Sequence, residues 1–146
     1  MTTGREIAAE AGPIGYALAQ ASRAHRLEMQ RQMTQLGLHL GQELLIVDLH
    51  QHPGTTQADL VGRIGMEQPT IAKAITRMER AGFVERVADP GDRRVTRLHL
   101  TEQGEDVVQA VISAWADIES RAVDGLTPAE ADHLTRLLNT VRDSLA

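Results

Sequence analysis

The sequence lacks several residue types on which whole classes of protein depend. It contains no cysteine, so disulfides, thiolate metal sites and thiol redox sensing are excluded. Its aromatic set is Tyr16, Phe83 and Trp115, too few for a reader that stacks successive bases on aromatic side chains. No apolar run approaches the roughly 20 residues that cross a bilayer. The N-terminal residues show no basic patch followed by an apolar stretch. We therefore expect a cytoplasmic protein without a signal peptide or a membrane partner.

The composition favours a single folded domain over residues 1–146. Hydrophobic residues make up 42% of the chain, enough for an ordinary core, and the net charge of −5 is too modest for a disordered chain. The charge is unevenly spread. Eight cations and five carboxylates between Arg63 and Arg97 give that segment +3, so the rest of the chain carries −8. A basic segment in an acidic frame indicates a module that faces a polyanion, with chance clustering on a solvated face as the alternative.

Hydrophobic periodicity and turn residues predict six helices and one β-hairpin. The helices are expected at residues 13–35, from about 40 to a stop at 52–54, from a cap at Thr55 or Thr56 to Gly65, at about 67–81, from a cap at Thr101 to a break at Gly125, and from a capping box at Thr127 onward. Two β-prone runs, 83–87 and 95–100, flank a turn-rich stretch at 89–94. Short helices joined by a tight turn and followed by a hairpin make a winged helix-turn-helix. The expected fold is therefore mainly α (α+β), with a winged lobe at 38–100 and helical regions at 13–35 and 101–146.

The helix at about 67–81 carries the most specific chemistry. At 100° per residue, Ile71, Ile75 and Met78 share one face, which we expect to be buried. The opposite half carries donors and cations and has no carboxylate between Gln68 and Met78; its residues are Pro69, Thr70, Lys73, Thr76 and Arg77. A DNA major groove admits such a helix, and its base edges offer acceptors to Gln, Lys and Arg. An ordinary amphipathic surface helix is the alternative, and a carboxylate at Glu67 would repel a phosphate at the helix start.

The predicted hairpin adds a second cationic element. Arg93 and Arg94 stand at its tip beside Asp92, and Arg86 and Arg97 lie on its strands. Arginines on a projecting tip can enter the minor groove, where the negative potential is strongest when the groove is narrow. Asp92 can hold one guanidinium in a fixed orientation. A surface pair that only staples the turn, worth roughly 0–1 kcal/mol, is the alternative.

The middle of the chain resembles the MarR-type winged-helix transcriptional regulators. The resemblance rests on five blocks in order: Thr56-Gln57-Ala58-Asp59-Leu60, Gln68-Pro69-Thr70-Ile71, residues 77–86 (RMERAGFVER), residues 89–94 (DPGDRR) and Leu100-Thr101-Glu102-Gln103-Gly104. It implies a homodimer in which the first, fifth and sixth helices intertwine. It also implies groove-facing roles for Gln68, Pro69, Thr70, Lys73 and Arg77, a staple at Asp92, and a minor-groove contact from Arg93 or Arg94. The sequence departs from the commonest family pattern at Glu67 and Lys73, which leaves base preference open.

The terminal helices support dimerisation independently of the resemblance. Their apolar stripes would have little partner surface in a lone subunit, so a second copy is expected to cover them; the stripe residues are Ile14, Leu18, Leu134, Leu138, Val141 and Leu145. Packing of the two stripes on each other within one subunit is the alternative.

These patterns lead to one expected function and one rival. We expect a sequence-specific DNA-binding regulator, a homodimer on a pseudo-palindromic operator. The family resemblance makes it a repressor released by a small-molecule effector held near His25, Arg26 and Trp115, although Trp115 is better suited to filling the core. A winged-helix module that binds protein without sequence-specific DNA binding is the alternative. No catalytic motif, cofactor motif or metal-ligand spacing is present, so we expect neither an enzyme nor a metalloprotein.

Overall fold

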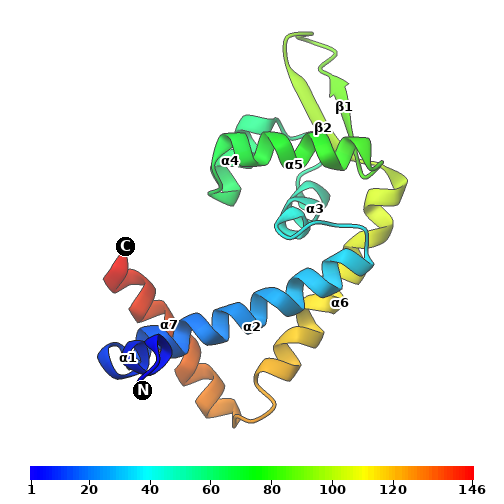
Figure 1. The fold of residues 1–146 in the computed structure, drawn as a ribbon. Helices are drawn as coiled ribbons and strands as arrows, with labels where there is room; N and C mark the ends of the chain where they lie inside the picture. The colour runs from blue at the N-terminus through cyan, green and yellow to red at the C-terminus, as the bar shows by residue number, and fades with distance from the viewer.

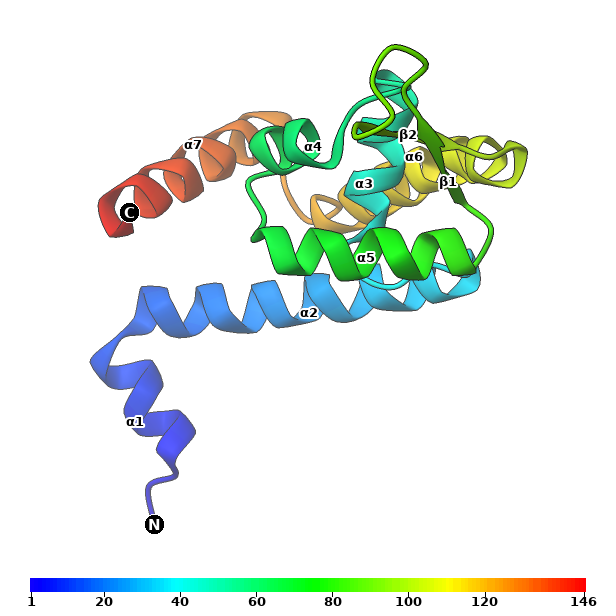
Figure 2. The same cartoon turned by 90° about the horizontal axis from the view of Figure 1, so that it is seen from above.

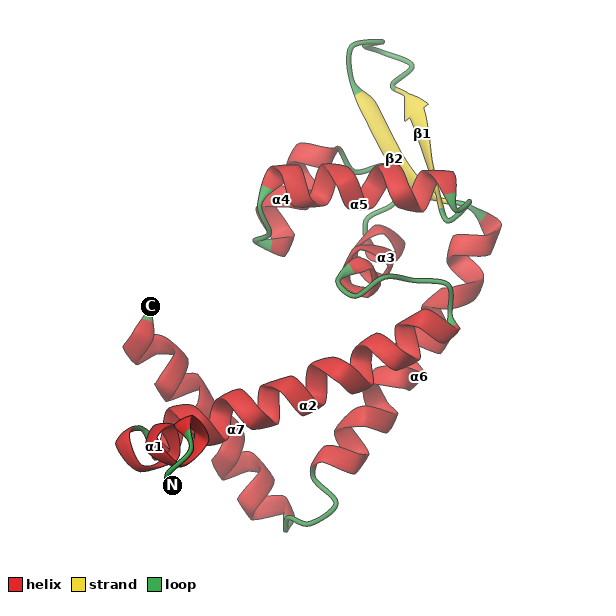
Figure 3. Cartoon of the chain, in the orientation of Figure 1, coloured by secondary structure: helices red, strands yellow, loops and turns green.

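The computed structural model describes residues 1–146 and consists of helices with one small hairpin (Figures 1 and 3). The elements in chain order are α1 (Gly4–Ala11), α2 (Pro13–Gln35), α3 (Gln42–Gln51), α4 (Gln57–Ile64), α5 (Gln68–Arg80), β1 (Val84–Ala88), β2 (Thr96–Leu100), α6 (Glu102–Ala122) and α7 (Pro128–Leu145). The predicted winged helix-turn-helix with flanking helices is confirmed. None of the helices combines the length and the apolar character needed to cross a membrane.

Helix boundaries follow the local signals in the sequence. The Thr56 and Thr101 side chains accept hydrogen bonds from backbone N–H groups in the first turns of α4 and α6. Thr127 and Glu130 form the predicted capping box of α7. Gly65 ends α4 with φ of +72°, the left-handed conformation that favours glycine. These contacts satisfy N–H and C=O groups that a helix terminus otherwise leaves unpaired.

The sequence prediction missed α1. Thr3 and Glu6 form a reciprocal capping box at its start, and this spacing was present in the sequence as a start signal. The helix is eight residues long and contains no buried residue, so it has no apolar stripe of the kind that predicted the other helices. The helical arm therefore begins before residue 13.

One continuous core joins the winged lobe to the long helices. Its fully or almost fully buried side chains are Met33, Leu45, Ile46, Leu49, Leu60, Ile71, Ile75, Met78, Val84, Leu98 and Val111. The strands pair antiparallel, with Val84 opposite Leu100 and Ala88 opposite Thr96, and an isolated bridge joins Thr55 to Leu98. Because Leu98 and Leu100 both point inward, the hairpin is held on the helices and projects beyond α5 (Figure 1).

The arm formed by α1, α2, α6 and α7 leads away from the lobe, and both chain termini lie at its far end (Figure 1). An ionic cluster ties α2 to α6: the Arg121 guanidinium lies 2.7 Å from the Glu28 carboxylate. In contrast, α7 contains no buried residue, and Leu134, Leu137 and Leu138 are each more than 40% exposed. Figure 2 shows α7 well separated from α2. The terminal stripes therefore do not cover each other within one chain.

A close backbone approach at the start of α6 explains the glycine that ends the Leu-Thr-Glu-Gln-Gly block. A Cβ atom on Gly104 would lie 2.2 Å from the Phe83 carbonyl oxygen and 3.1 Å from Leu100 Cβ. We expect Gly104→Ala to lower the free energy of unfolding by roughly 1–3 kcal/mol, because the clash is with backbone that cannot move freely. Urea unfolding followed by circular dichroism measures this change. Gly62→Ala in α4, where a Cβ meets nothing within 4 Å, is the control and should instead stabilise by about 0.5–1 kcal/mol.

Candidate nucleic-acid interface

The orientation of α5 is set by its apolar face. Ile71, Ile75 and Met78 are completely buried, as the periodicity predicted. Pro69 sits in the first turn, where its missing N–H costs nothing. Glu67 is the N-cap residue, but its side chain makes no capping hydrogen bond. The opposite side of the helix is consequently fixed toward solvent.

Every residue predicted on that outer side is exposed. The set is Gln68, Pro69, Thr70, Lys73, Thr76 and Arg77. Thr76 Oγ1 donates to the Ala72 carbonyl oxygen at 3.0 Å. Lys73 and Arg77 belong to none of the ion pairs in the chain, so both charges are available to an external anion.

Arg80 belongs to the same surface and was not among the predicted site residues. It lies seven residues after Lys73 and three after Arg77, so the three cations form one stripe along the helix. Arg80 is exposed and forms no ion pair. The sequence prediction left it out, although its spacing was the signal that could have found it.

The hairpin tip is organised by two aspartates. Asp89 Oδ1 accepts hydrogen bonds from the backbone N–H groups of Gly91 at 2.7 Å and Asp92 at 3.2 Å, which shapes the turn. Asp92 accepts from Arg94 Nε at 3.1 Å, from an Arg94 terminal nitrogen at 3.1 Å and from the Arg94 backbone N–H at 3.0 Å. These bonds from the guanidinium and the backbone lower the pKa of Asp92.

The structure therefore distinguishes the two tip arginines. Arg94 is paired with Asp92 while its side chain remains 91% exposed, so its guanidinium projects in a fixed orientation. Arg93 is exposed and has no ion-pair partner. The sequence had left open which of the two is held.

Arg86 and Arg97, the two strand arginines predicted to bind DNA, have partners within the chain. Arg86 Nε lies 3.4 Å from a Glu79 carboxylate oxygen, which links β1 to α5. Arg97 Nε donates to Asp89 Oδ2, and an Arg97 terminal nitrogen donates to the Gly54 carbonyl oxygen at 2.9 Å. The Arg97 guanidinium lowers the pKa of Asp89. Both arginines brace the hairpin against the helices.

Comparison with known proteins shows which family and which solved structures this chain is similar to. Residues 38–96, which include α3, α4, α5 and β1, match the MarR family. The solved structure of the PcaV transcriptional regulator from Streptomyces coelicolor superposes with a TM-score of 0.81 at 25% identity, covering 90% of this chain and 96% of that one. The winged lobe of the chain is therefore similar to the MarR family, and the chain as a whole has the fold of this solved regulator. The HTH-type transcriptional regulator YybA of Bacillus subtilis (strain 168) is 29% identical over 110 residues, 75% of this chain and 73% of that protein.

Another similar solved structure is that of BpsR from Bordetella bronchiseptica. The DNA binding of BpsR is regulated by 6-hydroxynicotinic acid. It is 25% identical with a TM-score of 0.76, and the match covers 89% of this chain and 93% of that one. The matched family and the named relatives are transcriptional regulators rather than enzymes, which supports a DNA-binding regulator.

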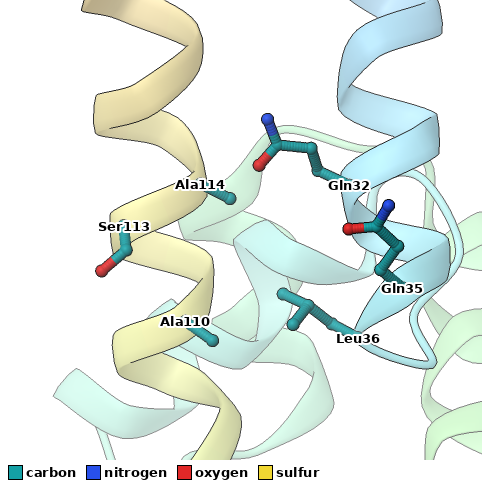
Figure 4. Close-up of a pocket in the computed structure, with 6 residues that line it drawn as sticks. All are labelled: Gln32, Gln35, Leu36, Ala110, Ser113 and Ala114. Atoms are coloured by element: carbon teal, nitrogen blue, oxygen red, sulfur yellow. The ribbon is translucent and has the colours of Figure 1, made fainter.

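Two hollows lie near the helices where the family resemblance places an effector. One, of about 290 Å³, lies between α2 and α6 and is lined by Gln32, Gln35, Leu36, Ala110, Ser113 and Ala114 (Figure 4). The other, of about 170 Å³, lies between the α2–α3 turn and α5; it is lined by residues 39–42 with Met66, Thr70, Lys73, Ala74 and Arg77. His25, Arg26 and Trp115 line neither, so their predicted place around a pocket is wrong for these two hollows. Trp115 is half-buried and packs against the core.

Two histidines at the end of α3 each form an ion pair with a different carboxylate. His50 Nδ1 lies 2.7 Å from Glu105 Oε2, and His52 Nδ1 lies 3.6 Å from Asp48 Oδ1. His99 is half-buried against Gly54. No group of three or more possible ligands comes together.

The partners of Arg97 predict a structural role that can be tested without DNA. We expect Arg97→Ala to loosen the base of the hairpin, raising hydrogen exchange roughly fivefold at the Leu98 and Gly54 amides, because a hydrogen bond contributes about 1 kcal/mol. Those two amides donate across the junction between β2 and the α3–α4 loop. Exchange followed by NMR measures the effect, and Arg93→Ala is the matched control. Equal exchange in both variants would contradict a bracing role.

Proposed function

We propose that the protein is a homodimeric transcriptional repressor that binds a pseudo-palindromic operator and is released by a small molecule. The observation that carries the proposal is the carboxylate-free, solvent-facing stripe of α5 beside an arginine that is already oriented at the hairpin tip. Helix α5 and the hairpin pack on the same core, so their exposed cations keep a fixed position relative to each other. Each subunit would place α5 in a major groove and the hairpin in the adjacent minor groove.

In the major groove, the roles follow from position along α5. Gln68 and Thr70 lie in the first turn, where side chains reach base edges, and Gln pairs well with adenine. Lys73 and Arg77 follow on the same side and have both base acceptors and phosphates within reach. Arg80, at the end of the stripe, suits a backbone phosphate at the groove edge. Phosphate contacts position the helix, and base contacts specify the site.

In the minor groove, Arg94 is the inserting residue. Arginine loses about 1.5–2 kcal/mol of side-chain conformational entropy when it is fixed, and Asp92 imposes part of that loss before DNA arrives. Arg93 faces solvent beside it and suits a phosphate on the groove wall. Arg86 and Arg97 contribute by holding the hairpin at its angle to α5.

A second copy of the chain is the partner that fits the terminal helices. No residue of α1 or α7 is buried, and Ile14 on α2 is 69% exposed. Isolated amphipathic helices are marginal in water, so α7 needs an apolar partner to persist. A twofold dimer places its two α5 helices on half-sites about one helical turn, ~34–36 Å, apart.

The protein-interaction alternative lacks the surface it requires. Protein interfaces have an apolar centre, whereas α5 exposes no large hydrophobic residue and the hairpin exposes one, Val87. Repression with release by an effector is supported by the likeness to BpsR, whose DNA binding is regulated by a small molecule.

Selection of binding sites from random duplexes tests the function and its symmetry together. The purified protein should enrich one pseudo-palindrome whose halves are about 10 base pairs apart centre to centre. Sedimentation at low micromolar concentration should show a dimer. Enrichment of no motif would overturn sequence-specific binding, and a stable monomer that still enriched a single half-site would overturn the dimer alone.

The fixed orientation of Arg94 predicts an unequal effect of the two tip arginines. On the selected duplex, Arg94→Ala should weaken binding by about 1–3 kcal/mol, whereas Arg93→Ala should cost less and mainly lower the salt slope by about 1. Asp92→Asn should fall between them, because it removes the orienting charge but keeps the arginine. Fluorescence anisotropy over a series of salt concentrations measures all three. A larger loss from Arg93→Ala would reverse the assignment.

A further inference from the structure

Lys73 is the only lysine in the sequence, because every other residue that carries a fixed positive charge is an arginine. A guanidinium stays protonated in proteins, whereas a lysine amine can lose its proton and act as a nucleophile. Apart from the amine at the N-terminus, Lys73 is therefore the single target in this chain for a reagent that acylates amines. It lies on the outer stripe of α5, which faces DNA in the proposed function.

The amine of Lys73 is accessible and has no partner within the chain. The residue is exposed and belongs to none of the ion pairs. Helix α5 itself has no carboxylate between Gln68 and Met78 that could hold the amine. The Nζ atom is consequently available to a reagent that arrives from solution.

The surroundings of Lys73 favour a reagent with negative charge. Lys73 and Arg77 both line the hollow of about 170 Å³ between the α2–α3 turn and α5, and none of its lining residues is an aspartate or glutamate. Residues four apart on a helix have Cβ atoms roughly 5–6 Å from each other, so both cations reach the same small molecule. A dianion about 6 Å from one cation in water is enriched roughly tenfold before salt screens the attraction.

Two carboxylates are adjacent to lining residues in sequence, and neither lines the hollow. Glu43 is buried, and its Oε2 accepts a hydrogen bond from the Gly41 backbone N–H at 2.6 Å. Glu67 is exposed at the N-cap of α5, six residues before Lys73. The positive charge at Lys73 and Arg77 is therefore not neutralised by an ion pair in the chain.

We propose that Lys73 is an acylation site whose donor is a small acyl phosphate. The neutral Nζ attacks the acyl carbonyl carbon, and an N–C bond forms as the C–O bond to the phosphate breaks. The phosphate leaves with the bonding electron pair, and the proton lost by the amine goes to water. Arg77 holds the phosphate of the donor beside the amine. The product is a neutral amide in place of a cation, and no oxidant or reductant is required.

Acylation changes the surface that faces DNA. It removes one of the unpaired positive charges of α5 and leaves those of Arg77 and Arg80 in place. DNA binding should therefore weaken without being abolished, and bound DNA should shield the amine from the donor. The modification itself does not depend on DNA recognition, whereas its effect on operator binding rests on the proposed function.

The rate of acetylation at Lys73, followed by peptide mass spectrometry of the full chain, tests the site and its donor. The reagents are acetyl phosphate and the neutral ester N-acetoxysuccinimide, and the quantity compared is the ratio of their rates, which cancels the intrinsic reactivity of the amine. The reference amine is introduced by Arg23→Lys, at an exposed position without an ion pair, half a turn around α2 from Ile14. We expect the ratio to be at least about threefold higher at Lys73. An equal or lower ratio overturns the proposal.

A pair of charge substitutions tests the part played by Arg77. Arg77→Gln should lower the rate ratio at Lys73 to that of the reference amine, because the phosphate of the donor loses its partner. Arg80→Gln removes the same charge from the same stripe, seven residues from Lys73, and should change the ratio less. Equal effects of the two variants, or no effect of Arg77→Gln, overturn the assignment of Arg77 to the donor phosphate.

The effect on DNA is measured separately, as the affinity for the selected duplex before and after treatment with acetyl phosphate. The treated protein should bind at least about fivefold more weakly, with a salt slope lower by about 1. Lys73→Arg has no side-chain amine, so its affinities before and after treatment should be equal. Bound duplex should slow acetylation at Lys73 and not at the reference amine. Acetylation that leaves the affinity unchanged overturns the regulatory role, whereas an untreated protein that binds no duplex overturns the proposed function and leaves the rate measurement valid.

Discussion

The burial of one face of α5 is the constraint on which the rest of the surface depends. Ile71, Ile75 and Met78 are completely buried, so the helix cannot turn about its axis without exposing them. Such a turn would also bring Lys73 into the core, and an unpaired buried charge costs several kcal/mol. The cationic stripe therefore faces outward for the same reason that the lobe folds. Recognition and stability share one set of apolar contacts, and a core substitution in α5 would disturb both.

Carboxylates within the chain divide the eight cations of the basic segment into two groups. Four are paired with an aspartate or glutamate: Arg63, Arg86, Arg94 and Arg97. The other four have no ion-pair partner: Lys73, Arg77, Arg80 and Arg93. The net charge of the segment conceals this division. The free cations gather on α5 and at the hairpin tip, whereas three of the paired ones fix the positions of α4 and the hairpin. Arg94 alone is both paired and almost fully exposed.

Local signals made most of the fold predictable, and side-chain geometry decided the rest. Caps at Thr56, Thr101 and Thr127 depend on residues three positions apart, so the sequence contains all of their chemistry. The partner of Asp92 could not be chosen in the same way, because Arg93 and Arg94 are adjacent and only the backbone of the turn decides between them. The lining of the hollow between α2 and α6 depends on how two helices distant in sequence cross. Gln32 and Gln35, which no motif distinguished, consequently line it in place of His25 and Arg26.

The position of this hollow connects the two halves of the molecule. Helix α6 begins at Glu102, one residue after the end of β2, and residues 36–41 connect α2 to α3, so both walls lead into the winged lobe. A molecule bound between α2 and α6 affects DNA binding only if it prefers one angle between these helices. Where it does, the coupling is reciprocal: DNA must weaken the affinity for the molecule by the same factor by which the molecule weakens the affinity for DNA. The Glu28–Arg121 cluster limits the range of angles, because it fixes the distance between α2 and α6 beside the hollow. Coupling of this kind would depend on a few polar contacts in the arm as well as on the exposed cations of α5 and the hairpin tip.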